Sequence, residues 1–262
     1  MEQSVRGTFF VEAHGNHKGV VKGSLEALVR GLKAEGGIKV LKESFGEVTE
    51  ELGQFSAMTE LELEFQSPLH YLLGTIKYGP SAIDLQSPEE LSLTAQEFVA
   101  LLGEVIKMAK AFYTRFGIGF ALNPGKGKGA KGVGLGEEKI EGLMRQGAIR
   151  AKVVVELGGK SKKRVVDDFI NTVSEEAFVH KVLTTKVEAA EGGEGFKGLV
   201  GVDIFFYEPK ALFDLAVKYT PVLVEIKEPE EIKMSILDLQ DIGVDLAAVF
   251  FEASHKIVSQ GG

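Results

Sequence analysis

The chain has 262 residues, of which 44% are hydrophobic and 26% charged, enough for two ordinary domains with hydrophobic cores. Cysteine is absent, which excludes disulfide bonds, thiolate nucleophiles and cysteine metal ligands. The net charge of −8 disfavours a globular face dedicated to nucleic acid. No apolar run approaches the roughly 18 residues of a membrane-spanning helix, and the N-terminus lacks signal-peptide blocks, so we expect a cytoplasmic protein without a membrane partner. Charged residues far outnumber Asn and Gln, which favours a thermophilic source.

The first half predicts strands and helices in alternation. Strands are predicted where β-rich or alternating segments occur, at residues 8–13, 38–48, 60–65 and 82–85. Helices are predicted from apolar residues at helical spacing, at residues 21–35, 68–78 and 88–116. The second helix begins at Pro68, a residue that suits the first helical turn, and the third begins at Pro88 and the acidic residues after it.

The stretch 61–91 recurs without a gap at 202–232, always 141 positions later. The repeated identities are Phe65/Phe206, Pro68/Pro209, Lys77/Lys218, Tyr78/Tyr219, Pro80/Pro221, Pro88/Pro229, Glu89/Glu230 and Glu90/Glu231. A match of this kind indicates an internal duplication. The second half accordingly predicts the same order, with strands at 153–157, 178–187, 199–207 and 222–226 and helices at 166–173, 210–218 and 235–258.

The order strand-helix-strand-strand-helix-strand is that of the ferredoxin-like superfold. We therefore predict an α+β protein of two tandem ferredoxin-like (βαββαβ) sandwiches from an internal duplication, each with an extra long C-terminal helix. The expected domains are residues 1–116 and 148–262, joined by a Gly/Lys-rich linker at 117–147 that contains a short helix. This superfold hosts ligand-sensing, RNA-binding and assembly modules, so it does not decide the function.

The linker offers one chemical signal. Residues Gly127 to Gly132 fit G-x-G-x-x-G, but no helix opens at these glycines, as a dinucleotide site requires, so a flexible linker is the main interpretation. Lysines on a glycine-rich chain can also contact phosphate without sequence specificity. Our alternative hypothesis is therefore an RNA- or ribosome-associated factor that contacts phosphate through Lys126, Lys128 and Lys131.

Two histidines lie in the first strand-to-helix turn. His14 and His17 could ligate a metal ion, with His70 or Glu12 completing the site. The corresponding turn of the second half has no histidine, and exposed loop histidines are the commoner case. We therefore predict neither a metal site nor a cofactor.

The third strands of the two halves differ on one face. Glu60, Glu62 and Glu64 line this face in the first half, and we expect them to stay in water. The second half places Phe205 and Tyr207 there, and we expect the helix 235–258 or a second subunit to cover them.

No arrangement of catalytic residues recurs in both halves, so we do not expect an enzyme. The prediction is a non-catalytic binding or assembly protein that acts through its sheet faces and helices. Its partner would be another protein, a second copy in a homo-oligomer, or a small ligand.

Overall fold

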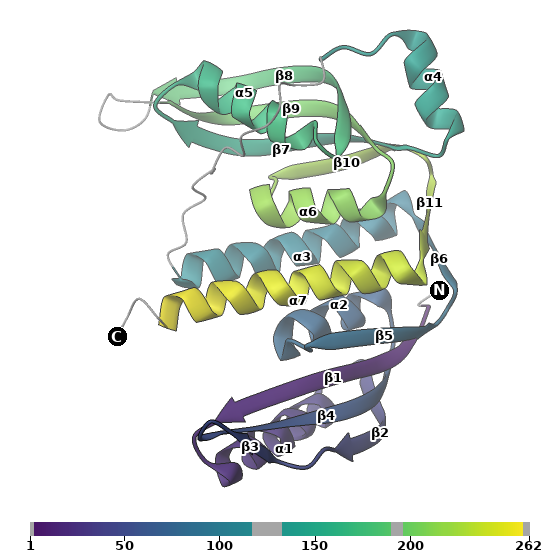
Figure 1. Ribbon diagram of the computed structural model, residues 1–262. Coiled ribbons are helices and arrows are strands. Elements are labelled where there is room, and N and C mark those ends of the chain that lie inside the picture. Colours follow the sequence, from purple (N-terminus) through teal and green to yellow (C-terminus); the bar gives the residue numbers. More distant parts are fainter. Residues whose placement is uncertain (1–2, 117–132, 190–195, 259–262) are drawn as a thin grey trace. The chain divides into compact units, whose positions relative to one another are not determined.

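The computed structural model describes residues 3–116, 133–189 and 196–258 (Figure 1). The chain forms two compact units: unit 1 comprises residues 1–91 and 233–262, and unit 2 comprises residues 92–232. Helices and antiparallel sheets occur in both units, which confirms the α+β class.

Unit 1 is built on an antiparallel sheet. Its strands are β1 (Val5–Gly15), β2 (Ile38–Phe45), β3 (Thr49–Glu51), β4 (Gln54–Phe65) and β5 (Ala82–Ser87). They lie in the order β2-β4-β1-β5, and β3 pairs with β4. The helices of this unit are α1 (Lys18–Ala34), α2 (Pro68–Tyr78) and α7 (Ile236–Val258). The sequence fits these elements, because Ser67 caps α2 by accepting a hydrogen bond from the His70 amide and Gly79 ends it in the left-handed conformation.

The core of unit 1 is centred on three fully buried aromatic rings. Phe9, Phe65 and Tyr71 come from β1, β4 and α2, and their ring centroids lie 5.3 to 6.1 Å apart. Leu61, Leu63 and Phe65 alternate with exposed or half-buried glutamates, as the period-two pattern predicts.

Unit 2 has an antiparallel sheet of four strands: β7 (Ile149–Gly159), β8 (Ala177–Ala189), β9 (Phe196–Phe206) and β10 (Leu223–Glu228). Their order is β10-β7-β9-β8. The helices of this unit are α3 (Ala95–Phe116), α4 (Glu137–Arg145), α5 (Lys162–Val173) and α6 (Pro209–Tyr219). Two further short strands, β6 (Glu90–Thr94) and β11 (Glu231–Ser235), form a two-stranded sheet.

The long helices are exchanged between the two halves of the sequence. The domains expected at 1–116 and 148–262 keep each long helix with the sheet that precedes it. In the structure α7 packs on α2 and β5, whereas α3 packs on α6 and β10.

The cause of the exchange lies in the segments after Pro88 and Pro229. We expected the first of these segments to begin a helix, but both are strands, and the helices begin only at Ala95 and Ile236. The alternation of apolar residues in Glu90–Thr94 and Glu231–Ser235 suits a strand, and it carries the chain from one unit to the other.

Candidate functional site

One face of the unit 2 sheet carries an apolar row. Helices α5 and α6 pack on this sheet through its buried face, and residues directly opposite one another in an antiparallel ladder share a face. The register aligns four residues across the strands on the other face: Leu223, Val154, Gly201 and Leu183. Leu223 is 46% exposed and Leu183 is 39% exposed. Gly201 has no side chain, and an added Cβ at this position would lie 3.1 Å from the Leu183 carbonyl oxygen.

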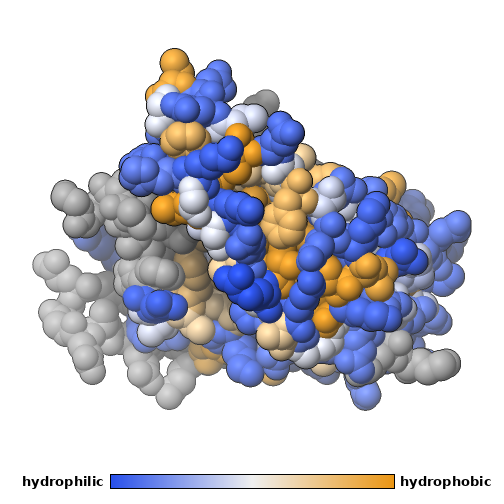
Figure 2. All heavy atoms as spheres, turned by 90° about the horizontal axis from the view of Figure 1, so that it is seen from below, coloured by the Kyte–Doolittle hydropathy of each residue, from blue (hydrophilic) through white to orange (hydrophobic). Residues whose placement is uncertain are grey.

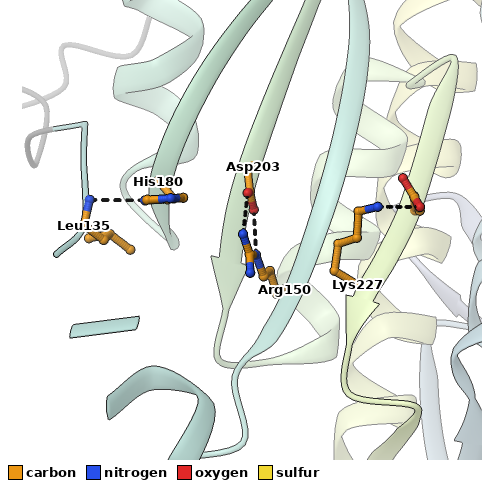
Figure 3. Close-up of polar contacts among 6 residues, drawn as sticks. Leu135, Arg150, His180, Asp203 and Lys227 are labelled. Carbon is orange, nitrogen blue, oxygen red and sulfur yellow. Dashed lines mark hydrogen bonds and ion pairs between the residues drawn. The ribbon is translucent and has the colours of Figure 1, made fainter. Parts of the chain in front are cut away.

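A charged row lies beside the apolar row on the same face. It alternates in sign across the sheet, in the order Glu225, Lys152, Asp203 and Lys181. Figure 3 shows the Arg150 guanidinium facing Asp203, with Nη2 donating to Oδ2 at 2.8 Å and Nε donating to Oδ1 at 3.1 Å. Lys227 donates to Glu225 at 2.6 Å. The two carboxylates of the row, Asp203 and Glu225, are therefore each paired with a cation of the same sheet.

The Arg150–Asp203 pair is the most buried of these ion pairs, with side-chain exposures of 27% and 16%. Burial alone would raise the pKa of Asp203, but the hydrogen bonds and charge of Arg150 outweigh it and hold this pKa below its usual range. The hydrogen bond to Asp203 raises the pKa of Arg150 in turn. The pair is therefore charged on both sides at neutral pH, as a structural ion pair is.

A third row of the face is aromatic and is covered by α4. Phe205 and Phe178 are opposite in the ladder, and Phe205 is fully buried against Leu143 and Ala148. The sequence predicted a cover for Phe205 by the helix 235–258 or by a second subunit. Among the described residues the cover is the short helix of the predicted linker, so this expectation is corrected.

The turn after α4 explains why this helix covers Phe205. Gly147 adopts a left-handed conformation with φ of 80°, its amide donates to the Met144 carbonyl at 3.0 Å, and the Ala148 amide donates to the Leu143 carbonyl at 3.1 Å. This is a Schellman motif, in which the residue after the glycine also packs on the last helical turn. Only three residues separate α4 from β7, so the helix folds back over the end of that strand.

Tyr207 is the second aromatic residue predicted as an interface. It is 44% exposed, its hydroxyl donates to the Gln146 side-chain oxygen at 3.0 Å, and its ring lies edge-on to Phe178 at 5.5 Å. Lys139 of α4 lies over the Phe178 ring at 4.9 Å. Tyr207 thus borders the covered row at the edge of α4.

His180 was missed by the sequence reasoning. It lies where the register of β8 shifts between Val179 and Lys181, and such a bulge re-aims a side chain. Its Nδ1 accepts a hydrogen bond from the Leu135 amide at 3.4 Å (Figure 3). The histidine therefore anchors the segment that leads into α4.

The corresponding face of unit 1 is charged. Glu62 is paired with Arg6 at 3.8 Å and with Lys42 at 3.4 Å, and Glu64 is paired with Lys39 at 3.7 Å. From the side shown in Figure 2, hydrophilic residues cover much of the surface and hydrophobic residues gather in groups between them. The glutamates of β4 thus remain at the surface, in contrast to the buried Phe205.

The chain matches the MJ0538 family over residues 7–260. It belongs to this family. It is 32% identical to the uncharacterized protein MJ0538 of Methanocaldococcus jannaschii over 255 residues, which cover 94% of this chain and 96% of the relative. That relative comes from a thermophilic archaeon. No solved structure matches the chain.

In this member of the MJ0538 family, the two histidines considered as metal ligands are exposed. His14 Nε2 lies 3.4 Å from Glu12 Oε2, whereas His70 is engaged with the Ser67 hydroxyl at 2.8 Å and packs against Gly37. Within the described residues there is no group of three or more His, Asp or Glu side chains that could hold a metal ion.

Unit 1 also has an open surface pocket of about 430 Å³, which is lined by Ser4, Gly37, Ile38, Lys39, Glu64 and Gln66. The linker lysines Lys126, Lys128 and Lys131 lie outside the described residues.

No helix in the described ranges is long and apolar enough to cross a membrane.

Proposed function

We propose that this chain is a non-catalytic protein-binding protein that docks a protein partner on the open face of the unit 2 sheet. The observation that carries the proposal is the apolar row Leu223, Val154, Gly201 and Leu183, in which Leu223 and Leu183 are exposed next to the charged row. Apolar side chains framed by polar ones are typical of protein interfaces.

The charged groups of this face support binding over acid–base chemistry. Asp203 is held as an anion by Arg150, and Glu225 accepts a hydrogen bond from Lys227. A general acid or base needs a pKa near the working pH, whereas the pKa of Asp203 is moved away from neutrality. The alternating signs of the row would instead select the orientation of a partner.

We further propose that each half is a ferredoxin-like unit and that the two arose by duplication. Two observations support this. The strands of each half, taken in chain order, lie in the sheet as second, third, first and fourth when β3 is set aside. The sequence stretches 61–91 and 202–232 also match without a gap. The proposed binding face of unit 2 is then the face of its sheet that lies opposite α5 and α6.

Cross-linking of the chain in extracts of its source cell, with a lysine-reactive reagent, tests the binding face. We expect partner cross-links to concentrate at Lys152 and Lys181, which lie in the charged row. The double variant Leu183→Asp/Leu223→Asp should lose the partner, because it places charges in the apolar row. The matched control is Leu52→Asp, at a fully exposed turn of unit 1. A partner that binds the double variant as well as the native chain would refute the proposal.

A further inference from the structure

The strands β6 and β11 carry backbone hydrogen bonds that repeat with the spacing of the duplication. The Ala95 amide donates to the Glu230 carbonyl at 2.8 Å, and the Ile236 amide donates to the Glu89 carbonyl at 2.9 Å. Ala95 and Ile236 are equivalent positions, and so are Glu89 and Glu230, since both pairs are 141 residues apart. Each half of the sequence therefore donates one backbone hydrogen bond to the other half and accepts the equivalent one from it.

The side chains of these strands repeat the same exchange. The Ser92 hydroxyl donates to the Glu231 carboxylate, and Lys233 donates to Glu90 at 3.1 Å. Ser92 is equivalent to Lys233, and Glu90 is equivalent to Glu231. A contact in which position i meets j while j meets i is the signature of isologous pairing between two identical chains.

The two long helices begin at equivalent residues with equivalent caps. Thr94 and Glu97 form a reciprocal capping pair, with amide-to-side-chain bonds of 2.9 and 3.2 Å. Ser235 and Asp238 form the same pair 141 positions later, with bonds of 3.0 and 3.1 Å. Such caps fix where α3 and α7 start. Both helices therefore leave the crossing strands in the same way.

The surfaces that receive the helices are equivalent too. Helix α3 packs on α6 and β10, and α7 packs on α2 and β5, which are the matching elements of the two halves. In unit 2 the Phe98 and Phe213 rings meet edge to face at 5.6 Å. In unit 1 the Gln240 side chain accepts a hydrogen bond from the Leu85 amide at 2.8 Å. The long helix of each half of the sequence therefore packs on the equivalent surface of the other half.

We infer that the repeat is a self-associating module whose receiving surface fits the strand and long helix of a second copy of the same repeat. The chain is the covalent fusion of such a helix-exchanged pair. Its halves are held together by this exchange and not by the connection between them. The inference is independent of the binding face proposed above.

The first test cuts the full-length chain between its halves. Residues 125–132 are replaced by a protease site of equal length, the protein is cleaved under native conditions, and its mass is measured during size-exclusion chromatography at nanomolar concentration. We expect both fragments to elute together at the mass of the uncut chain. Elution as two separate folded fragments would overturn the inference, because each half would then have kept its own helix.

The second test detects pairing between two copies of one repeat. Glu90→Cys/Ser92→Cys is introduced into the cleavable chain, which otherwise contains no cysteine. In the native pairing position 90 faces Lys233 and position 92 faces Glu231, but in a pair of N-terminal fragments the thiol at position 90 of one copy faces the thiol at position 92 of the other. After cleavage and incubation in mild denaturant to let fragments exchange, followed by oxidation, we expect disulfide-linked N-terminal fragments on a non-reducing gel.

The control for this test is the single variant Ser92→Cys, which faces no thiol in the reciprocal pairing. It should give no linked fragments under the same conditions. Absence of linked fragments in the double variant, or equal linking in the single variant, would overturn the inference.

Discussion

Replacing Gly243 by alanine tests whether α7 is fitted to unit 1. An added Cβ would lie 1.9 Å from the Tyr71 hydroxyl oxygen and 2.6 Å from Cζ of the ring, so the tyrosine or the helix must move. Tyr71 is fully buried between Phe9 and Phe65, and its hydroxyl donates to the Gln240 carbonyl at 3.4 Å. The ring therefore has little space in which to retreat.

The expected cost follows from two opposing effects. Overpacking of a core costs about 1–3 kcal/mol, whereas exchanging glycine for alanine inside a helix stabilises it by roughly 0.5–1 kcal/mol. The free energy of unfolding of Gly243→Ala should fall by up to about 2.5 kcal/mol, as the difference of these terms. Gly103→Ala in α3 is the matched control, because no described atom lies within 4 Å of its Cβ position, and it should raise this free energy.

The assay is urea unfolding of both variants, followed by circular dichroism at several wavelengths. A third variant, Gly243→Ala/Tyr71→Phe, removes the oxygen that clashes. It should recover part of the loss, so that the two substitutions are not additive. If Gly243→Ala stabilises the chain as much as Gly103→Ala does, α7 does not pack on Tyr71, and the helix exchange is refuted.

Three further outcomes are expected. The low pKa of Asp203 means that its contribution to stability is complete above the ordinary Asp pKa of about 3.9 and is lost as the pH falls through the lower folded value. Arg150→Gln should therefore flatten the acid limb of the stability–pH curve, and parallel curves would contradict the ion pair. Phe205→Ala should cost about 3–5 kcal/mol in urea unfolding, because it opens a cavity under α4, whereas Tyr207→Ser should cost less than about 1 kcal/mol since the ring is half exposed; equal costs would contradict the cover. If the RNA alternative holds, replacing the three linker lysines by Gln should lower RNA affinity in a filter-binding assay and reduce the salt slope by up to about three units, and no RNA binding by the native chain would remove this alternative.

The local elements were predictable because their signals are local. Alternation of Leu61, Leu63 and Phe65 indicates a strand with one buried face, and Pro68 indicates a helix start, as the structure has them. The start of α3 was placed too early. Proline followed by acidic residues is typical of a first helical turn, and this outweighed the shorter alternation of Leu91 and Leu93, which belongs to β6.

The partners of the long helices and of Phe205 could not be read from periodicity. An apolar stripe tells that a helix face is buried, but it does not tell against which sheet. Gly243 was the available signal for the exchange, because an isolated glycine inside a helix costs stability unless something packs closely against it. The glycine-rich segment 117–147 is typical of a linker, and this pattern hides that Leu143 near its end helps to cover Phe205.

Comparison of the two halves of the sequence separates the features that they share from those that differ. The crossing strands and the helix caps match position for position, and the receiving surfaces match element for element, so they serve the common architecture. The sheet faces do not match, because Glu60, Glu62 and Glu64 of the first half correspond to Gly201, Asp203 and Phe205 of the second. Phe205 differs because α4 covers it in unit 2, and the partner proposed above would account for the exposed Leu183 and Leu223 of that face.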